Sequence, residues 1–449
     1  MKQKFYLLLL PFSCLFVTRI LTNYFHTSED YFPDKSQWLQ FDNPEEAGFN
    51  SAKIKDIKGA FDSLHAHSFL ALYKGKVLLN WGDNARRMRC ASIRKSLLSA
   101  LIGIQVDQHQ INLEETVCNI NLDAFSMLDS LECTAQIKDL LTSTSGIYLP
   151  AAYEPEIWTK RKPARGSHAP GKFWYYNNWD FNVLGTIYEH FSSHSIAFDF
   201  NNGIAVPTGM QDYRPEWDFK YFFEADIPVP AYLFKLSTRD LARFGLLYLR
   251  QGRWKDQQIV PSGWVSQSTT DHAVPWENTG YGYLWWRTQL KDGTDLYYAS
   301  GSGTQGVFVL PSRDLVVVFR ADTYLGPEIS SGEDLKLVQM LCDAQMTGQT
   351  EKEDPKCSSV NWREVVFTDS DFNSGNWIGK YRNNIAREIS IDQVDDHLIL
   401  ETKIADFLMH LETDTTAWIE DLNIPAFLRT SEQKEGTSIL SKENLIIYK

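Results

Sequence analysis

A serine followed three residues later by a lysine is the pair in this chain best suited to chemistry. The pair is Ser92 and Lys95, and an apolar run from Ser96 to Ile104 follows it directly. Residues three apart share one face of a helix, so we expect the lysine amine beside the serine hydroxyl. A helix N-terminus favours developing negative charge, and a neighbouring base turns a hydroxyl into a nucleophile. The spacing therefore predicts a nucleophilic serine with a candidate base.

The same spacing occurs a second time, at Ser431 and Lys434. That copy lies in a polar stretch with no apolar run behind it, and we interpret it as a surface loop. Spacing alone does not separate the two copies, so the surrounding sequence has to decide between them.

Tyr176 and Asn178 are a second pair with chemical potential, on a turn before the helical pattern at 182–188. A tyrosine has a pKa of about 10 in water. Beside a lysine ammonium it could ionise to a phenolate and take a proton from serine. The asparagine could hold a substrate carbonyl and the lysine in place. The alternative is an aromatic loop packed on the core.

The glycine-rich segment Ala299–Gly306 contains Gly-x-Gly-x-x-Gly. A dinucleotide site requires a helix after this pattern, whereas the strand-like run Val307–Pro311 follows it, so we expect no cofactor. A glycine-rich strand end allows close approach by a ligand. An N–H group here, at Ser300, Gly301 or Ser302, could complete an oxyanion hole with the N–H of Ser92. The cysteines and histidines show no metal-ligand spacing, so we expect no metal.

The elements that must position these groups indicate an α+β fold. We predict helices at 51–65, 240–249 and 335–344, and strands at 69–73, 77–81, 281–286, 295–299, 307–310 and 315–319. Between about residues 113 and 250 the periodicity is mainly helical. Strands at both ends of a region with helices between them predict one antiparallel sheet flanked by helices, with a mostly helical subdomain.

The chain divides into a catalytic region and a smaller C-terminal region. We expect the main domain at 37–346, a polar linker at 347–365 and a small β-rich domain at 366–449. Residues 1–25 carry Lys2 and Lys4 before a short apolar run, which is typical of a secretory signal or an N-terminal anchor. We therefore expect an exported protein, which is periplasmic, secreted, or tethered to a membrane through this segment.

The net charge excludes one class of partner, and the cysteine content allows disulfides. The formal net charge of −13 argues against nucleic acid, which requires a basic face. An exported protein can form disulfides, and the spacings Cys118…Cys133 and Cys342…Cys357 would allow two local loops.

Together the motifs resemble the serine β-lactamase and penicillin-binding-protein-like hydrolases of the class C type, with their esterase and 6-aminohexanoate-dimer hydrolase relatives. The resemblance rests on Ser92–Ser96, Tyr176–Asn178, Ala299–Ser302, Pro207–Met210 and Leu236–Gly245. It implies a β-lactamase/DD-peptidase-like fold and an acyl-enzyme on Ser92. It also implies that Lys95 and Tyr176 move the proton, with the choice of base left open. The N–H groups of Ser92 and Ser302 would stabilise the oxyanion.

One departure from the family pattern bears on the substrate. Ala299 stands where many relatives have a lysine or histidine that helps to bind a substrate carboxylate. We therefore expect a small-molecule ester, amide or peptide-like substrate. The alternatives are β-lactamase or D-Ala-D-Ala carboxypeptidase activity with penicillin binding, and a non-catalytic binding protein with the same fold. Aromatic residues near the motifs could line an apolar pocket or pack in the core: Trp174, Tyr175, Trp179, Trp285, Trp286, Tyr297 and Tyr298.

Overall fold

The computed structural model describes residues 30–448 with internal gaps. The undescribed positions are 1–29, 325, 347–354, 363–378, 384–386, 395–396, 403–405, 414–415, 423, 430–436, 441–444 and 449. The predicted signal at 1–25 and the second Ser-x-x-Lys copy at 431–434 therefore lie outside the described residues.

A large sheet joins the two ends of the main region. Strand β2 (Ser68–Tyr73) pairs antiparallel with β14 (Leu315–Arg320), so residues some 250 positions apart become neighbours. Within the described residues the strand order is β15-β1-β3-β2-β14-β13-β12-β11-β10-β9. The prediction that both ends pair in one sheet is confirmed. The other strands are β1 (Leu39–Phe41), β3 (Lys76–Gly82), β9 (Ala273–Trp276), β10 (Thr279–Tyr281), β11 (Trp286–Gln289), β12 (Asp295–Gly301), β13 (Gln305–Leu310) and β15 (Cys357–Ser359).

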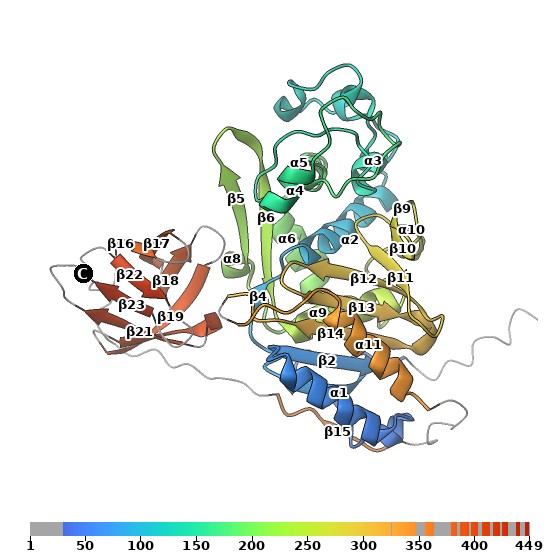
Figure 1. The fold of residues 1–449 in the computed structure, drawn as a ribbon, viewed down its shortest axis with the longest axis vertical. Helices are drawn as coiled ribbons and strands as arrows, with labels where there is room; N and C mark the ends of the chain where they lie inside the picture. The colour runs from blue at the N-terminus through green and yellow to red at the C-terminus, as the bar shows by residue number, and fades with distance from the viewer. Residues whose placement is uncertain are drawn as a thin grey trace, which may run out of the picture. The chain divides into compact units, whose positions relative to one another are not determined.

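Alternation along the central strands gives the sheet two apolar faces. Phe69 and Ala71 of β2 pack in one core, whereas Leu70 and Leu72 pack in another. Helices α1 (Ser51–Ser63) and α11 (Glu333–Ala344) lie side by side on the first face (Figure 1). Helices α2 (Ile93–Asp107) and α9 (Thr238–Leu249) supply the second core. The period-two pattern of buried strands thus specifies a sheet covered by helices on both faces.

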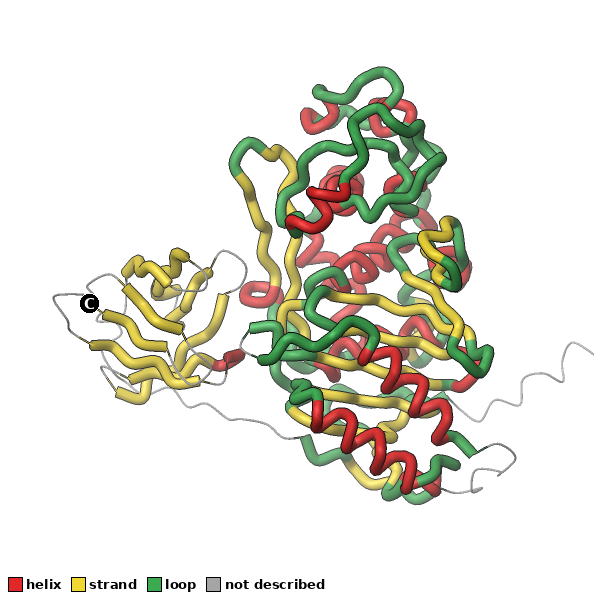
Figure 2. Tube along the Cα trace, in the orientation of Figure 1, coloured by secondary structure: helices red, strands yellow, loops and turns green. Residues whose placement is uncertain are grey.

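Close contact between α9 and the sheet depends on a glycine. A Cβ atom on Gly245 would stand 2.6 Å from Cγ1 of Val316, nearer than any side chain tolerates. The α+β class and its flanking helices, predicted from the sequence, are confirmed. The remaining described α-helices fall between residues 137 and 268, and Figure 2 draws helices in red: α3 (Ile137–Leu141), α4 (Glu156–Arg161), α5 (Asn178–Ser192), α6 (Ile196–Phe200), α7 (Val206–Thr208), α8 (Pro215–Asp218) and α10 (Ser262–Ser268).

Three local expectations differ from the structure. The strand predicted at 281–286 is interrupted at 282–285, where the N–H of Leu284 bonds to the Leu141 carbonyl instead of a neighbouring strand. A hairpin of β5 (Phe219–Glu224) and β6 (Ile227–Leu236) lies in the region expected to be helical, because Pro228 and Pro230 obscure its strand pattern. Strand β15 lies within the predicted linker and pairs with β1.

The C-terminal residues form a closed β-barrel. Its strand order is β16-β17-β18-β19-β20-β21-β23-β22, and its core includes Ile391, Leu400, Met409 and Ile419. The strands are β16 (Gly379–Asn383), β17 (Arg387–Val394), β18 (His397–Thr402), β19 (Asp406–Thr413), β20 (Thr416–Ile419), β21 (Ile424–Arg429), β22 (Thr437–Leu440) and β23 (Leu445–Tyr448). The β-rich character predicted for this region is confirmed, and closure of the sheet removes its edges.

Cysteine pairing follows the sequence expectation in one case of two. A disulfide joins Cys118 to Cys133. Cys342 is a buried thiol, so the predicted pairing of Cys342 with Cys357 is wrong. Within the described ranges, every helix falls short of the length and apolar character needed to cross a membrane.

Candidate active site

Ser92 stands at the entrance to helix α2, and Lys95 lies one turn further along. Strand β4 (Met88–Arg89) leads to Ala91, whose φ of 46° is a left-handed backbone that a non-glycine residue rarely adopts. Such strain is concentrated at functional sites. Lys95 Nζ donates a hydrogen bond of 2.8 Å to Ser92 Oγ, and the serine remains partly exposed while the lysine is buried. A reagent can therefore reach the hydroxyl while its candidate base is kept from water.

Two further serines of α2 fix the helix against the interrupted segment at 282–285. Ser96 Oγ donates to the Leu284 carbonyl and Ser99 Oγ to the Tyr283 carbonyl, each at 2.7 Å. These bonds use carbonyl groups that a continuous strand would have given to the sheet ladder. The same two hydrogen bonds thus interrupt the strand and hold α2 in place.

The surroundings of Lys95 favour its neutral amine. Burial, reinforced by the neighbouring charge of Arg94, lowers the pKa of Lys95 well below its ordinary value. Its Nζ lies 4.9 Å from the ring centre of Tyr176 and 4.7 Å from that of Phe181. Among the residues that the structure describes, no carboxylate acts on the pKa of Lys95. A lysine without a counter-ion in a dry site loses its proton easily and can act as a general base.

Tyr176 has the opposite character. Burial raises the pKa of Tyr176 to about 12, although its hydrogen bonding with Ser92 and the charge of Arg94 act in the other direction. The phenol therefore keeps its proton near neutral pH and serves as a donor rather than as a base. This ionisation is the reverse of the phenolate considered from the sequence.

A buried polar network sets the turn that carries Tyr176. Ser143 Oγ donates to the Tyr175 carbonyl at 2.6 Å and accepts from the Asn177 N–H at 3.0 Å. The Asn177 amide donates to Asp180 and to the Ile147 carbonyl, at 2.9 and 2.6 Å. These bonds hold the turn between the 143–147 loop and helix α5, so the position of the phenol is fixed by groups that need not touch a substrate.

Asn178 opens helix α5 and is buried, yet its amide nitrogen finds no hydrogen-bond partner within the described part of the chain. A buried donor left unpaired costs about 1–3 kcal/mol. A ligand carbonyl would satisfy it, which agrees with the substrate-holding role expected for this residue.

The glycine-rich strand end lies against the residues that precede Ser92. A Cβ atom on Gly301 would stand 2.7 Å from the Cys90 carbonyl oxygen, so only glycine permits this approach. The β11 ladder ends at Trp286 and Tyr298, one residue before Ala299. Ser300 pairs with Gly306 on β13, and the exposed Ser302 follows in the turn. The β12 residues from Ala299 onward are therefore not paired with β11.

Aromatic side chains surround Tyr176. Trp286 stacks on it with ring centres 5.7 Å apart, and Trp158 and Trp174 approach it at 5.1 and 6.4 Å. Of the aromatic residues named from the sequence, Trp174 and Trp286 approach Tyr176, and Tyr298 stacks on Trp286. The remaining four are buried in the core: Tyr175, Trp179, Trp285 and Tyr297. Sequence reasoning did not single out Trp158, Phe181 or Arg94, because only the fold brings the first two to Tyr176 and Lys95.

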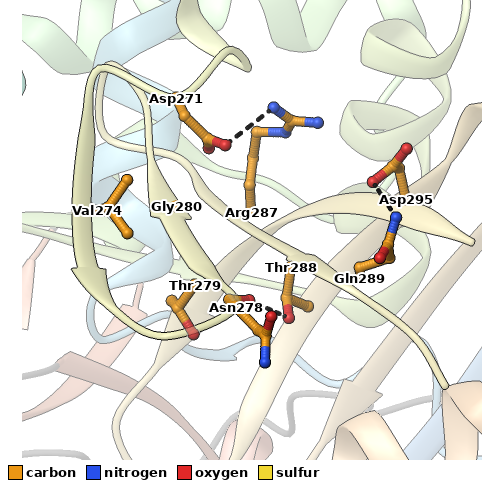
Figure 3. A pocket seen from close by; sticks show the side chains of 9 residues that line it. All are labelled: Asp271, Val274, Asn278, Thr279, Gly280, Arg287, Thr288, Gln289 and Asp295. Carbon is orange, nitrogen blue, oxygen red and sulfur yellow. Dashed lines mark hydrogen bonds and ion pairs between the residues drawn. The ribbon is translucent and has the colours of Figure 1, made fainter. Parts of the chain in front are cut away.

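A separate polar pocket lies at the outer edge of the sheet. It encloses about 250 Å³ across β9, β10 and β11, and an ion pair of 3.2 Å between Arg287 and Asp271 crosses one side (Figure 3). None of the predicted site residues lines it, so we do not assign the catalytic step to this pocket. Within the described residues, no group of three histidine, cysteine or acidic side chains is arranged to hold a metal ion.

Comparison with known proteins gives a consistent picture of the fold. The family model described as "Beta-lactamase" matches residues 68–327, more than half of the chain. No curated protein matches the chain. A solved structure described as a 6-aminohexanoate-dimer hydrolase from Bacillus anthracis is 18% identical, with a TM-score of 0.52 over 64% of this chain and 80% of that one.

Two further solved structures share the fold at low identity. A protein described as a beta-lactamase from Bacteroides dorei is 18% identical, with a TM-score of 0.51 over 66% of this chain and 99% of that one. A penicillin-binding protein homologue from Caulobacter crescentus is 13% identical, with a TM-score of 0.50 over 65% of this chain and 97% of that one. At these identities the similarities show a shared fold.

Proposed function

Since the chain belongs to the β-lactamase family, we propose that it is a serine hydrolase that cleaves an ester or amide bond through an acyl-enzyme on Ser92. The observation that carries the proposal is the 2.8 Å hydrogen bond between Lys95 Nζ and Ser92 Oγ. It joins an accessible hydroxyl to a buried amine whose pKa is lowered by burial. This is the arrangement that activates a serine nucleophile.

Each step of the reaction has a group to perform it. Neutral Lys95 takes the proton of Ser92 as Oγ bonds to the substrate carbonyl carbon, and the carbonyl oxygen becomes an oxyanion. The N–H groups of Ser92 and Ser302 stabilise that charge. The proton then passes from the Lys95 ammonium to the leaving alcohol or amine as its bond to carbon breaks, through the Tyr176 phenol, which gives up its own proton and takes that of Lys95 in its place. Water attacks the acyl-enzyme as Lys95 accepts its proton, and that proton returns to Ser92 Oγ as the bond between Oγ and the acyl carbon breaks.

The third motif favours esters and amides over β-lactams. Ala299 is buried and offers no cation for a substrate carboxylate. We therefore rank β-lactamase or penicillin-binding activity second. The match to the β-lactamase family keeps it as a candidate. The substrate is a small molecule, and the acidic chain is a poor partner for nucleic acid.

We place the protein outside the cytoplasm as part of the same proposal. The disulfide between Cys118 and Cys133 supports this location, because such bonds persist in oxidising compartments. The basic and apolar character of residues 1–25 also supports export, with or without a lasting membrane tether. Fractionation of cells that express the whole chain, with alkaline phosphatase fused after residue 30, tests this. An inactive fusion retained in the cytoplasm would contradict export.

Covalent labelling tests the catalytic proposal. We expect a fluorophosphonate probe to add to the wild-type protein at Ser92, as located by peptide mass spectrometry, and to leave Ser92→Ala unlabelled. Ser63→Ala, which removes an exposed serine hydroxyl from α1 and keeps that of Ser92, serves as the matched control. A folded wild-type protein that resists both fluorophosphonate and penicillin would favour a non-catalytic binding protein. Penicillin labelling without ester turnover would favour the second candidate.

A further inference from the structure

We propose that Trp174, Trp276 and Trp286 form an aromatic platform that binds a neutral aromatic or long apolar group of the substrate beside Ser92. The proposal rests on the proposed function, since it names the substrate class of that site. It commits to one occupant, the substrate's own apolar group, because the rings of the platform lead directly to the catalytic tyrosine.

Parallel rings connect the surface to the site. Trp276 stacks on Trp286 with ring centres 5.6 Å apart and planes 8° from parallel. Trp286 in turn stacks on Tyr176 at 5.7 Å and 19°. The ring of Tyr176 lies 4.9 Å from Lys95 Nζ, which bonds to Ser92. The outer ring is therefore two stacked contacts from the ring that covers the candidate base.

Trp174 closes one side of the platform. Its ring meets those of Trp276 and Trp286 edge-on, at 5.3 and 5.8 Å. Its indole nitrogen is buried and has no hydrogen-bond partner in the part of the chain that the structure describes. Parallel and perpendicular rings in contact form a corner that suits another planar ring or an alkyl chain.

Exposure separates these rings from the core. Trp276 is 52% exposed and Val274, two residues before it on β9, is 70% exposed. In contrast, Trp285, next to Trp286 in the sequence, is fully buried against Phe244 and Tyr248. A tryptophan that served only to fill the core would be buried as Trp285 is. An exposed tryptophan that stacking contacts connect to the ring over Lys95 is instead typical of a binding surface.

The chemistry of the neighbouring side chains limits what the platform accepts. Trp276 and Trp286 contact the rings of Trp174, Tyr176, Tyr281 and Tyr298. The polar pocket begins further along the same hairpin, at Val274 and Thr288 (Figure 3). The platform therefore favours a neutral apolar group, and a charged group would have to reach Asp271 and Arg287.

Two measurements test the platform, one with turnover and one without. For turnover, we compare kcat/KM for p-nitrophenyl phenylacetate and p-nitrophenyl acetate. Trp276→Ala should lower the ratio of the two by about three- to tenfold, the loss expected for one aromatic contact. The control is Phe223→Ala, which removes another exposed ring, 68% exposed, from β5. Phe223→Ala should leave the ratio unchanged.

For binding, we titrate the Ser92→Ala protein with p-nitrophenyl phenylacetate and follow quenching of tryptophan fluorescence. The quenching should saturate, and the affinity obtained from it should fall by a similar factor when Trp276→Ala is combined with Ser92→Ala. If the wild type fails to react with fluorophosphonate but this binding persists, the hydrolase proposal is wrong and the platform stands. Equal effects of Trp276→Ala and Phe223→Ala in both measurements would overturn the platform.

Discussion

The opposite pKa shifts of Lys95 and Tyr176 lead us to predict which of the two is the general base. Burial raises the pKa of Tyr176 to about 12, whereas it lowers that of Lys95 well below its ordinary value. At about pH 7 only about one phenol in 10⁵ would be ionised, a handicap of roughly 7 kcal/mol. The buried amine carries no such handicap. We therefore expect Lys95 to take the serine proton and Tyr176 to act as a neutral hydrogen-bond donor.

Separate removal of each group tests this assignment. Lys95→Met should slow fluorophosphonate labelling of Ser92 by about 10³-fold or more and remove its rise with pH, because the base is lost. Tyr176→Phe keeps the ring that covers Lys95, so labelling should fall by only about 10- to 100-fold and keep the wild-type pH profile. Lys172→Met, which removes an exposed lysine near the same loop, is the control.

The pH profile supplies the sign of the effect. Labelling should rise with pH as Lys95 loses its proton, and the midpoint should lie well below 10.5, the ordinary lysine pKa. A Tyr176→Phe protein that is inert, together with a Lys95→Met protein whose labelling climbs until the phenol ionises, would refute the reasoning. Circular dichroism of each variant establishes that the fold is retained.

Three other outcomes follow from the same structure. Arg94→Met removes the charge that opposes protonation of Lys95, so the midpoint of the labelling profile should move to higher pH; a lower or unchanged midpoint would contradict this. Lys95→Met should also flatten the dependence of stability on pH. In the wild type, between the lowered pKa of Lys95 and 10.5, the unfolded chain binds a proton that the folded protein does not. The free energy of unfolding of the wild type therefore rises with pH across that window. Urea denaturation of both proteins below and inside that window shows whether the slope disappears. Paired replacement of Cys118 and Cys133 by serine should lower the free energy of unfolding by about 3 kcal/mol, given a loop of 15 residues, and calorimetry beside the oxidised wild type would expose a smaller effect.

Local spacing accounts for what was predictable from the sequence. Ser92 and Lys95 are one helical turn apart, so their contact follows from helix geometry alone. The central strands were predictable because residues such as Val316 and Val317 alternate between two cores. The closing of the C-terminal strands into a barrel was not, because it depends on which distant strands pair.

The features that could not be predicted depend on contacts between distant residues, or on backbone groups that bond to distant residues and not to a neighbouring strand. Trp158, Trp286 and Tyr176 come from separate regions of the chain, and no local pattern links them. The strand expected at 281–286 reads as apolar and aromatic, yet the serines of α2 and the Leu141 carbonyl take its hydrogen bonds. Tertiary hydrogen bonds here override a strand propensity that is itself weak.

The direction of the tyrosine pKa shows why residue types alone could not decide between Lys95 and Tyr176 as the base. A lysine beside a tyrosine suggests an ion pair that would stabilise a phenolate, provided that the lysine is charged. Here both groups are buried together, with the Lys95 amine over the Tyr176 ring. Burial penalises each charged form, so the pair is most stable with both members neutral. The rings that exclude water from Lys95 thus determine which group accepts the proton, and Trp286, stacked on Tyr176, links that exclusion to the surface where we expect the substrate.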